Sequence, residues 1–230
     1  MEPRTRNITA AFRLASAEDI ESGRDWYARA RRLAEELAAT WEPREYAQDG
    51  DDPWQDGAVE RAAAVIAALS PRLAWRKNVE YATLAYRLFY ATPNRPHPLQ
   101  SQAVFLSQIP TLKANALKAW RVLSGETPED VLGGPKVRAF YFTIANPTDP
   151  RAVVIDRHAF DVAVGQVLTD AARGVMLGRK GVYDSIATLY RRAAAIVTRE
   201  TGVPTTPAEL QAITWTYWRR ERAAAYHGEA

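Results

Sequence analysis

A pair of glycines in the middle of the chain, Gly133 and Gly134, comes directly before a basic stretch that contains Lys136 and Arg138. Glycine accepts a positive φ and therefore makes tight turns. The backbone N–H groups that open the next helix lack helical partners and carry the positive end of the helix dipole. The pattern predicts a hairpin that binds a phosphate, although an ordinary helix corner with a glycine cap explains the same residues.

A carboxylate, Asp156, is the second group that could do chemistry. It follows the short apolar run 152–155 and opens a predicted helix. The residues expected on the inner face of that helix are Phe160, Val164 and Val167. An aspartate at a helix start is most simply an N-cap, and its removal then costs roughly 1 kcal/mol.

Two predicted helices hold the glycine pair. Thr127 and Pro128 predict the start of the first helix, with the Thr127 hydroxyl as cap and the proline at the first helical position. The glycines end this helix, and 136–146 forms the second one. Its apolar residues recur at helical spacing: Val137, Phe140 and Ile144. The stretch from about 127 to 146 is therefore helix, hairpin, helix.

The rest of the chain supports an all-α fold. Further helices are predicted at 19–41, 58–69, 79–89, 100–107, 109–123, 165–181 with a glycine-punctuated end, 183–198, and from 206 onward. The helix at 58–69 is apolar on all sides, which predicts a place in the middle of a bundle. The stretches 42–57 and 91–98, the second of which contains His97, are rich in turn residues or proline and predict loops.

Composition limits the possible functions. With 230 residues, 47% of them hydrophobic and 25% charged, the chain is long enough for one large domain or two small lobes. It has no cysteine and only three scattered histidines, so we expect no disulfide, no iron–sulfur cluster, no metal and no cofactor. No apolar stretch is long enough for a membrane helix and the N-terminus is too polar for a secretory signal, so we expect a cytoplasmic protein. The net charge of +3 permits nucleic-acid binding without requiring it.

The hairpin and the aspartate together resemble a known family, the helix-hairpin-helix (HhH-GPD) DNA glycosylases of the endonuclease III and 8-oxoguanine glycosylase superfamily. That family carries L-P-G-x-G-x-x-T-A in its hairpin and V-D-x-H around its catalytic aspartate. The corresponding segments here are LGGPKVRA at 132–139 and IDRH at 155–158. Their separation puts Asp156 where the family keeps its catalytic aspartate. The resemblance covers about residues 58 to 168.

Two departures from the family pattern bear on the chemistry. Lys136 replaces the second hairpin glycine, and Arg138 stands where bifunctional members keep the lysine that attacks the sugar. Arginine stays protonated and cannot act as a nucleophile. Lys136, two residues earlier, could act as a displaced nucleophile, but its spacing to Asp156 fits the family pattern less well. The candidate catalytic residues are thus Asp156, Lys136 and Arg138, and we expect a monofunctional enzyme.

Other segments resemble the parts of these enzymes that face DNA. In 64–89, Leu69 and Ser70 match a DNA-facing turn, and Arg72 replaces the glutamine that family members insert into the gap left by an extruded base. The basic residues near this turn fit a solvated helix start equally well. The helix at 109–123 resembles the family helix before the hairpin, with Lys113 and Asn115 at its DNA-facing end. The remaining residues implied to contact DNA are Gly133, Gly134, Lys136, Arg157 and His158.

The resemblance implies a two-lobed helical bundle in which residues 1–230 form one glycosylase unit, with the base pocket in the cleft between the lobes. It implies hydrolysis of the N-glycosidic bond of a base that is flipped out of duplex DNA, by a protein that we expect to be a monomer. Asp156 would stabilise the positively charged sugar or position a water molecule. Some relatives in phages or in host defence against them act on hypermodified bases, so a modified pyrimidine is the candidate substrate by analogy.

Two other functions stay open. A non-catalytic helix-hairpin-helix DNA-binding protein would use Asp156 only as a cap, and a phage base-modifying enzyme could reuse the fold on modified thymine. The last helix, with Trp215, Trp218 and Arg219, could stack bases, but tryptophans in a helical bundle more often pack in the core. Substitution of Asp156 by Asn separates catalysis from capping, because Asn caps a helix nearly as well but carries no charge.

Overall fold

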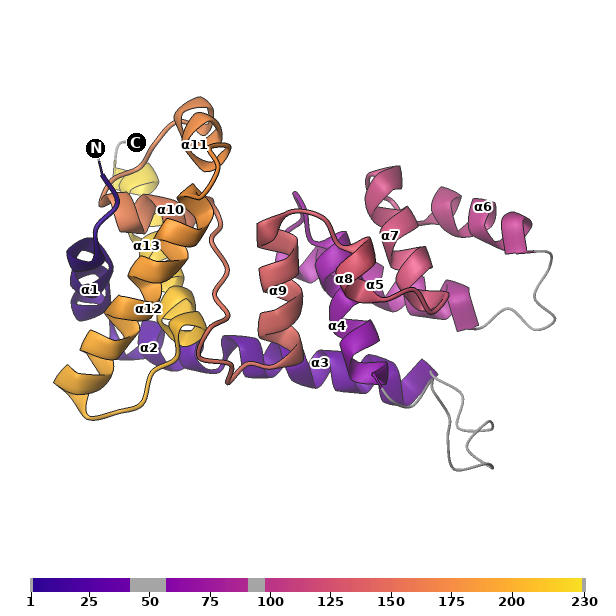
Figure 1. Ribbon diagram of the computed structural model, residues 1–230, viewed down its shortest axis with the longest axis horizontal. Coiled ribbons are helices and arrows are strands. Elements are labelled where there is room, and N and C mark those ends of the chain that lie inside the picture. The colour runs from indigo at the N-terminus through magenta and orange to yellow at the C-terminus, as the bar shows by residue number, and fades with distance from the viewer. Residues whose placement is uncertain (1, 42–56, 91–97, 229–230) are drawn as a thin grey trace. The chain divides into compact units, whose positions relative to one another are not determined.

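The computed structural model describes residues 2–41, 57–90 and 98–228. Most of the two predicted loops, including His97, lies outside these ranges. Within them every regular element is a helix (Figure 1), which confirms the all-α prediction. Among the described helices none is long and apolar enough to cross a membrane.

The chain divides into two compact units, Met1–Arg29 with Asn146–Ala230, and Ala30–Ala145. The first unit combines an N-terminal and a C-terminal segment of the chain. Its helices are α1 (Thr5–Leu14), α2 (Ala17–Arg24), α10 (Arg157–Val164), α11 (Asp170–Leu177), α12 (Val182–Thr201) and α13 (Pro207–Gly228). α1, indigo in Figure 1, packs against α12 and α13. Phe160, Tyr190 and Ile213 are fully buried in the core that these helices share.

The closest packing in this unit joins α2 to α13. A Cβ atom at Gly23 would lie 2.5 Å from the backbone of Ile213, so only glycine lets the two helices approach this far. α2 begins with a capping box, in which the Ser16 hydroxyl accepts from the Asp19 N–H and the Asp19 carboxylate accepts from the Ser16 N–H.

The single helix predicted at 19–41 is wrong, because two helices, α2 and α3 (Trp26–Trp41), occupy this stretch. They are separated by Asp25, whose dihedral angles (φ −85°, ψ −3°) stay near the helical region. The helical period therefore continues across the break, and spacing alone does not reveal it.

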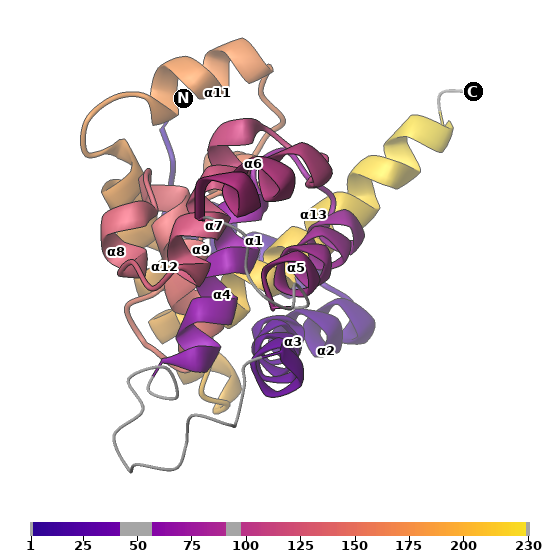
Figure 2. The same cartoon turned by 90° about the vertical axis from the view of Figure 1, so that its right-hand side faces the viewer.

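The second unit is built around one buried helix. Besides part of α3, it contains α4 (Ala58–Leu69), α5 (Trp75–Tyr90), α6 (Pro98–Gln108), α7 (Lys113–Leu123), α8 (Pro128–Val131) and α9 (Pro135–Ala145). α4 packs against α5, α7 and α9, which surround it in Figure 2. Every residue from Arg61 to Leu69 is buried, which confirms the place predicted for this helix.

Two predictions for the stretch after α10 are wrong. Val167, expected to point inward, is 50% exposed, because α10 ends at Val164 and Gly165 takes a left-handed conformation (φ 81°). The Gly165 N–H then donates to the Asp161 carbonyl at 2.8 Å, which closes the helix end. The helix predicted at 165–181 is also shorter, since α11 spans only Asp170–Leu177.

Candidate functional site

The glycine turn forms as predicted, but with one glycine rather than two in a left-handed conformation. Gly134 has φ 78°, whereas Gly133 is not among the positive-φ residues. The turn follows α8, which starts with Pro128 at its first position. The expected cap is absent, because the Thr127 side chain accepts no hydrogen bond at the helix start.

The turn leaves backbone donors free. The first hydrogen bond of α9 runs from the Arg138 N–H to the Gly134 carbonyl at 3.2 Å. The N–H groups that donate no hydrogen bond within the described residues are those of Gly133, Gly134, Lys136 and Val137. Gly133, Gly134 and Lys136 are exposed. These donors and the helix dipole form a local environment that favours an anion.

Two lysines lie at this turn. A Cβ atom at Gly133 would be 3.5 Å from the Nζ of Lys118, a half-buried residue of α7. Lys136 is exposed at the start of α9, and neither lysine has an ion-pair partner among the described residues. Sequence reasoning missed Lys118. No spacing points to it, because the packing of α7 against α8 brings it to the hairpin.

Arg138 holds the hairpin together. Its Nε donates to the Leu132 carbonyl at 2.7 Å, and its Nη2 donates to the Glu129 carbonyl at 3.0 Å. The guanidinium thereby binds carbonyls that have no partner at the end of α8. This role gives a structural reason for an arginine at position 138, where a nucleophile was not expected.

Arg72 occupies a strained turn between α4 and α5. It is the only residue other than glycine with a positive φ (66°) within the described chain. The Leu73 N–H donates to the Ser70 carbonyl at 3.2 Å, with Pro71 second and Arg72 third in the turn, which is the pattern of a type II turn. The third position of such a turn favours glycine, so arginine stores strain there, while its side chain stays exposed.

The start of α7 agrees only in part with a DNA-facing end. Lys113, its first residue, is exposed, and the preceding Leu112 gives no side-chain cap. Asn115 in contrast is 7% exposed, and its Nδ2 has no hydrogen-bond partner in the described chain. Asn115 is therefore buried, whereas a residue that faces DNA is expected to be exposed.

Asp156 is the N-cap of α10, and the packing uses both of its oxygens. Oδ1 accepts from the N–H groups of His158 at 3.0 Å and Ala159 at 2.8 Å. Oδ2 accepts from the indole Nε1 of Trp215 on α13 at 3.1 Å. The residue remains partly exposed. Its predicted cap role is confirmed, and the bond from Trp215 is one that sequence reasoning missed.

The two residues after Asp156 differ in accessibility. Arg157 is exposed, and its Nε lies 3.3 Å from the His158 Nε2. His158 is only 8% exposed, and its ring centroid lies 6.3 Å from that of Trp215. We therefore assign His158 to packing beside Trp215, whereas the side chain of Arg157 lies at the surface.

Trp215 is neither fully buried nor free. The Arg219 guanidinium carbon lies 4.5 Å from the centroid of its ring, and the ring of Trp26 meets it edge to face at 6.5 Å. These contacts hold the indole while leaving it partly exposed. The ring is therefore neither a fully buried core residue nor an open stacking platform, which were the two alternatives for this helix.

The segment that delivers Asp156 is fixed by the partly buried phenol of Tyr183. The Tyr183 hydroxyl accepts from the Ile155 N–H at 3.0 Å and donates to the Val153 carbonyl at 3.3 Å. Burial raises the pKa of Tyr183 above its ordinary value and outweighs the hydrogen bond from Ile155, while the charge of Asp156 raises it further. Tyr183 therefore stays protonated and keeps the extended run before Asp156 in place.

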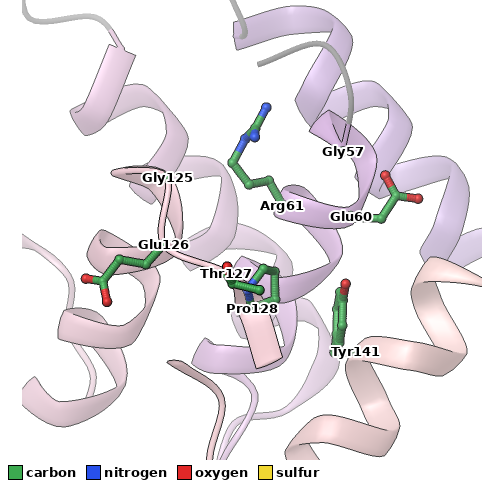
Figure 3. Close-up of a pocket in the computed structure, with 8 residues that line it drawn as sticks. All are labelled: Gly57, Glu60, Arg61, Gly125, Glu126, Thr127, Pro128 and Tyr141. Atoms are coloured by element: carbon green, nitrogen blue, oxygen red, sulfur yellow. The ribbon is translucent and has the colours of Figure 1, made fainter. Parts of the chain in front are cut away.

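A small hollow lies in the second unit, and none of the predicted site residues lines it (Figure 3). Its volume of about 170 Å³ is below the roughly 300–1,000 Å³ of typical ligand pockets. Figure 3 shows Tyr141 pointing its hydroxyl toward the side of the hollow that carries Glu60, whereas Glu126 points away. Burial, followed by the nearby Glu129, raises the pKa of Tyr141, so this phenol stays protonated.

The predicted site residues are divided between the units. Asp156, Arg157 and His158 belong to the first unit. Those of the second unit are Arg72, Lys113, Gly133, Gly134, Lys136 and Arg138. Among the described residues, no group of three or more acidic, histidine or cysteine side chains is placed to hold a metal ion.

Comparison with known proteins gives one match. The model of the family DUF7178, described as a family of unknown function, matches residues 1–222. No curated protein and no solved structure matches the chain.

Proposed function

We propose a function for this chain, which belongs to the DUF7178 family of unknown function: it is a monofunctional DNA glycosylase of the helix-hairpin-helix type. It would hydrolyse the N-glycosidic bond of a modified base that has been flipped out of duplex DNA. The fold type and the activity rest on the hairpin, on Asp156 and on the sequence pattern that joins them.

The observation that carries the proposal is the hairpin from α8 through Gly134 to α9. Its exposed backbone donors, the N-terminus of α9 and the ammonium groups of Lys118 and Lys136 all favour one anionic oxygen group. A DNA phosphate meets that requirement, and such a contact positions the duplex without reading its sequence. Arg138 supports the same role by holding the hairpin closed.

Asp156 supports the catalytic part of the proposal. Cleavage of an N-glycosidic bond develops positive charge on the sugar, and a fixed carboxylate beside it stabilises that charge much better than water does. Asp156 is fixed by three donors and remains partly exposed. Oδ2 accepts one of these bonds and so retains a lone pair for the sugar or for a water molecule.

Arg72 supports base flipping. Enzymes that act on a base must take it out of the stack, and a side chain that fills the gap lowers the cost of extrusion. The left-handed turn at Arg72 holds an exposed, cationic side chain in a conformation that arginine would not adopt by preference. Strained backbone conformations of this kind cluster at functional sites.

The proposal extends to a modified pyrimidine as substrate only through the resemblance to glycosylases that act on hypermodified DNA. A pocket that discriminates bases depends on a few hydrogen bonds, and no motif encodes them. The substrate class therefore has to come from experiment.

A second candidate, a non-catalytic helix-hairpin-helix DNA-binding protein, is favoured by one specific observation. The two backbone bonds to Oδ1 already give Asp156 a complete role as the N-cap of α10. On this alternative the hairpin binds DNA and the carboxylate does no chemistry.

The test is to incubate the protein with duplexes that carry single modified bases and with phage genomic DNAs that contain hypermodified pyrimidines. Abasic sites are then counted with an aldehyde-reactive label. Accumulation of abasic sites in one DNA of the panel, with the strand intact, is the expected result. Binding of DNA throughout the panel without an abasic site in any member would favour the non-catalytic alternative.

A further inference from the structure

A tryptophan from a distant part of the sequence completes the surroundings of Asp156. Trp215 lies on α13, and its Nε1 is the donor to Oδ2 at 3.1 Å. We propose that Trp215 is a positioning residue, which fixes the direction of Asp156 Oδ2 toward the substrate; this inference rests on the proposed function.

The division of work between the two oxygens leads to this assignment. Oδ1 accepts from two backbone N–H groups, so both of its lone pairs are used in holding α10. Only Oδ2 has a lone pair left, and therefore only Oδ2 can face a developing charge or a water molecule. Rotation of the carboxylate about its last torsion is soft, and the indole bond is the contact that acts on Oδ2 itself, in addition to the two backbone bonds on Oδ1.

The indole is itself held from several directions. Arg219 lies over the ring, and the rings of Trp26 and His158 lie near it at angles of 62° and 79°. A donor that is fixed before the substrate arrives needs no reorganisation during the reaction, which is what electrostatic stabilisation requires. Trp215 thus acts through Asp156 and is not itself in contact with the reacting atoms.

The chain offers a matched control three residues further along α13. The Nε1 of Trp218 is buried and has no hydrogen-bond partner in the described structure. Trp215→Phe and Trp218→Phe therefore remove the same indole group, but only the first change removes a hydrogen bond to a carboxylate. Asp156→Asn is the control that removes the charge.

The test uses two duplexes that contain no modified base. One carries a protonated pyrrolidine in place of a deoxyribose, which mimics the positive sugar, and the other carries a neutral tetrahydrofuran abasic analogue. The ratio of the two dissociation constants measures how well the protein stabilises the charge, independently of base identity. Transition-state analogues bind more tightly than substrates by about a hundredfold or more, so we expect the wild type to prefer the cation to the neutral analogue at least about tenfold.

We expect Trp215→Phe to lose most of this preference, while its affinity for the tetrahydrofuran duplex stays within twofold of the wild type. Trp218→Phe should keep the preference and Asp156→Asn should abolish it. If Trp215→Phe does not fold, 3-benzothienylalanine at position 215 replaces the N–H by sulfur, retains the bicyclic ring and should give the same loss.

Two results would overturn the inference in distinguishable ways. If the wild type, Trp218→Phe and Trp215→Phe share one cation preference that Asp156→Asn lacks, then Trp215 has no positioning role and the proposed function stands. If the wild type shows no preference for the cation, or Asp156→Asn retains it, the catalytic role of Asp156 fails and the inference fails with it.

Discussion

Arg138 and Leu132 are joined across the hairpin, the arginine Nε donating to the leucine carbonyl at 2.7 Å. The bond ties the first turn of α9 to Leu132, the C-cap residue of α8. A side chain in this position holds the backbone around Gly134 in the shape that leaves its donors exposed. It also uses the guanidinium, so Arg138 has a structural role in the hairpin.

We predict that the protein forms no Schiff base with the DNA sugar, because neither Arg138 nor Lys136 can act as the nucleophile. The arginine cannot lose its proton, and a lysine that faces a phosphate stays charged and unreactive. Borohydride trapping on abasic or substrate DNA should therefore give no covalent adduct. An adduct that disappears in Lys136→Ala would contradict this prediction and make Lys136 the nucleophile.

Lys118→Ala and Lys136→Ala should each weaken DNA binding by a similar factor for every sequence. Each change removes one phosphate contact, so the slope of log affinity against log salt should fall by about 1. Lys180→Ala, the same change at an exposed residue before α12, is the control and should leave the slope intact. Equal slopes in all the variants would remove the hairpin from the DNA interface.

Arg72→Gly should separate stability from function. Glycine relieves the left-handed strain at this turn but adds freedom to the unfolded chain, so the free energy of unfolding should be unchanged or rise by up to about 1 kcal/mol. Base excision should nevertheless fall at least several-fold, because glycine cannot fill the gap left by a flipped base. Urea unfolding and single-turnover excision measure the two effects, and a destabilised variant with full activity would contradict both expectations.

The sequence predicts those helices whose start and period are both distinct. α13 begins with Thr206 and Glu209, which form the reciprocal cap, and α4 is apolar on all sides. α1 escaped prediction although Ile8 and Phe12 recur at helical spacing, because Arg4 provides no side-chain cap to mark its start. The break at Asp25 is hidden for the opposite reason, since the backbone there remains nearly helical.

We predict that the stability contributed by the packing of α2 on α13 depends on pH through Asp19. Burial raises the pKa of Asp19, but the hydrogen bonds from Arg220 and Ser16 outweigh burial and leave it below the ordinary value of 3.8. The stabilisation by ionised Asp19 is therefore complete above that ordinary value and is lost as the pH falls through the lower, folded-state pKa. Arg220 stays charged throughout this range.

Asp19→Asn should thus lower the free energy of unfolding by roughly 1–2 kcal/mol at pH 7, since its partner Arg220 is half exposed and the pair is partly screened. The difference between variant and wild type should shrink below about pH 4, where wild-type Asp19 also becomes neutral. A difference that stays constant from pH 7 to pH 3 would show that the charge of Asp19 does not contribute.

Some features of the candidate site are determined by neighbouring residues in the sequence, and others by the packing of distant helices. Gly134 and the capping role of Asp156 follow from the order of residues, because turns and caps are decided within a few positions. Lys118 and Trp215 could not be found this way, since helix packing brings each to its partner from far along the chain. The burial of His158 and Asn115 also results from helix packing, and it could not be predicted from the sequence because both side chains are polar.

Asp156→Asn tests the central claim most directly. Asn keeps the bonds to the α10 backbone through its oxygen, but its NH₂ group would face the Trp215 N–H, so stability should fall by only about 1 kcal/mol. We predict that base release in a single turnover, on whichever DNA the wild type acts on, falls at least about a hundredfold, because the charge that stabilises the sugar is gone. A folded Asp156→Asn variant that releases the base at the wild-type rate would contradict the account.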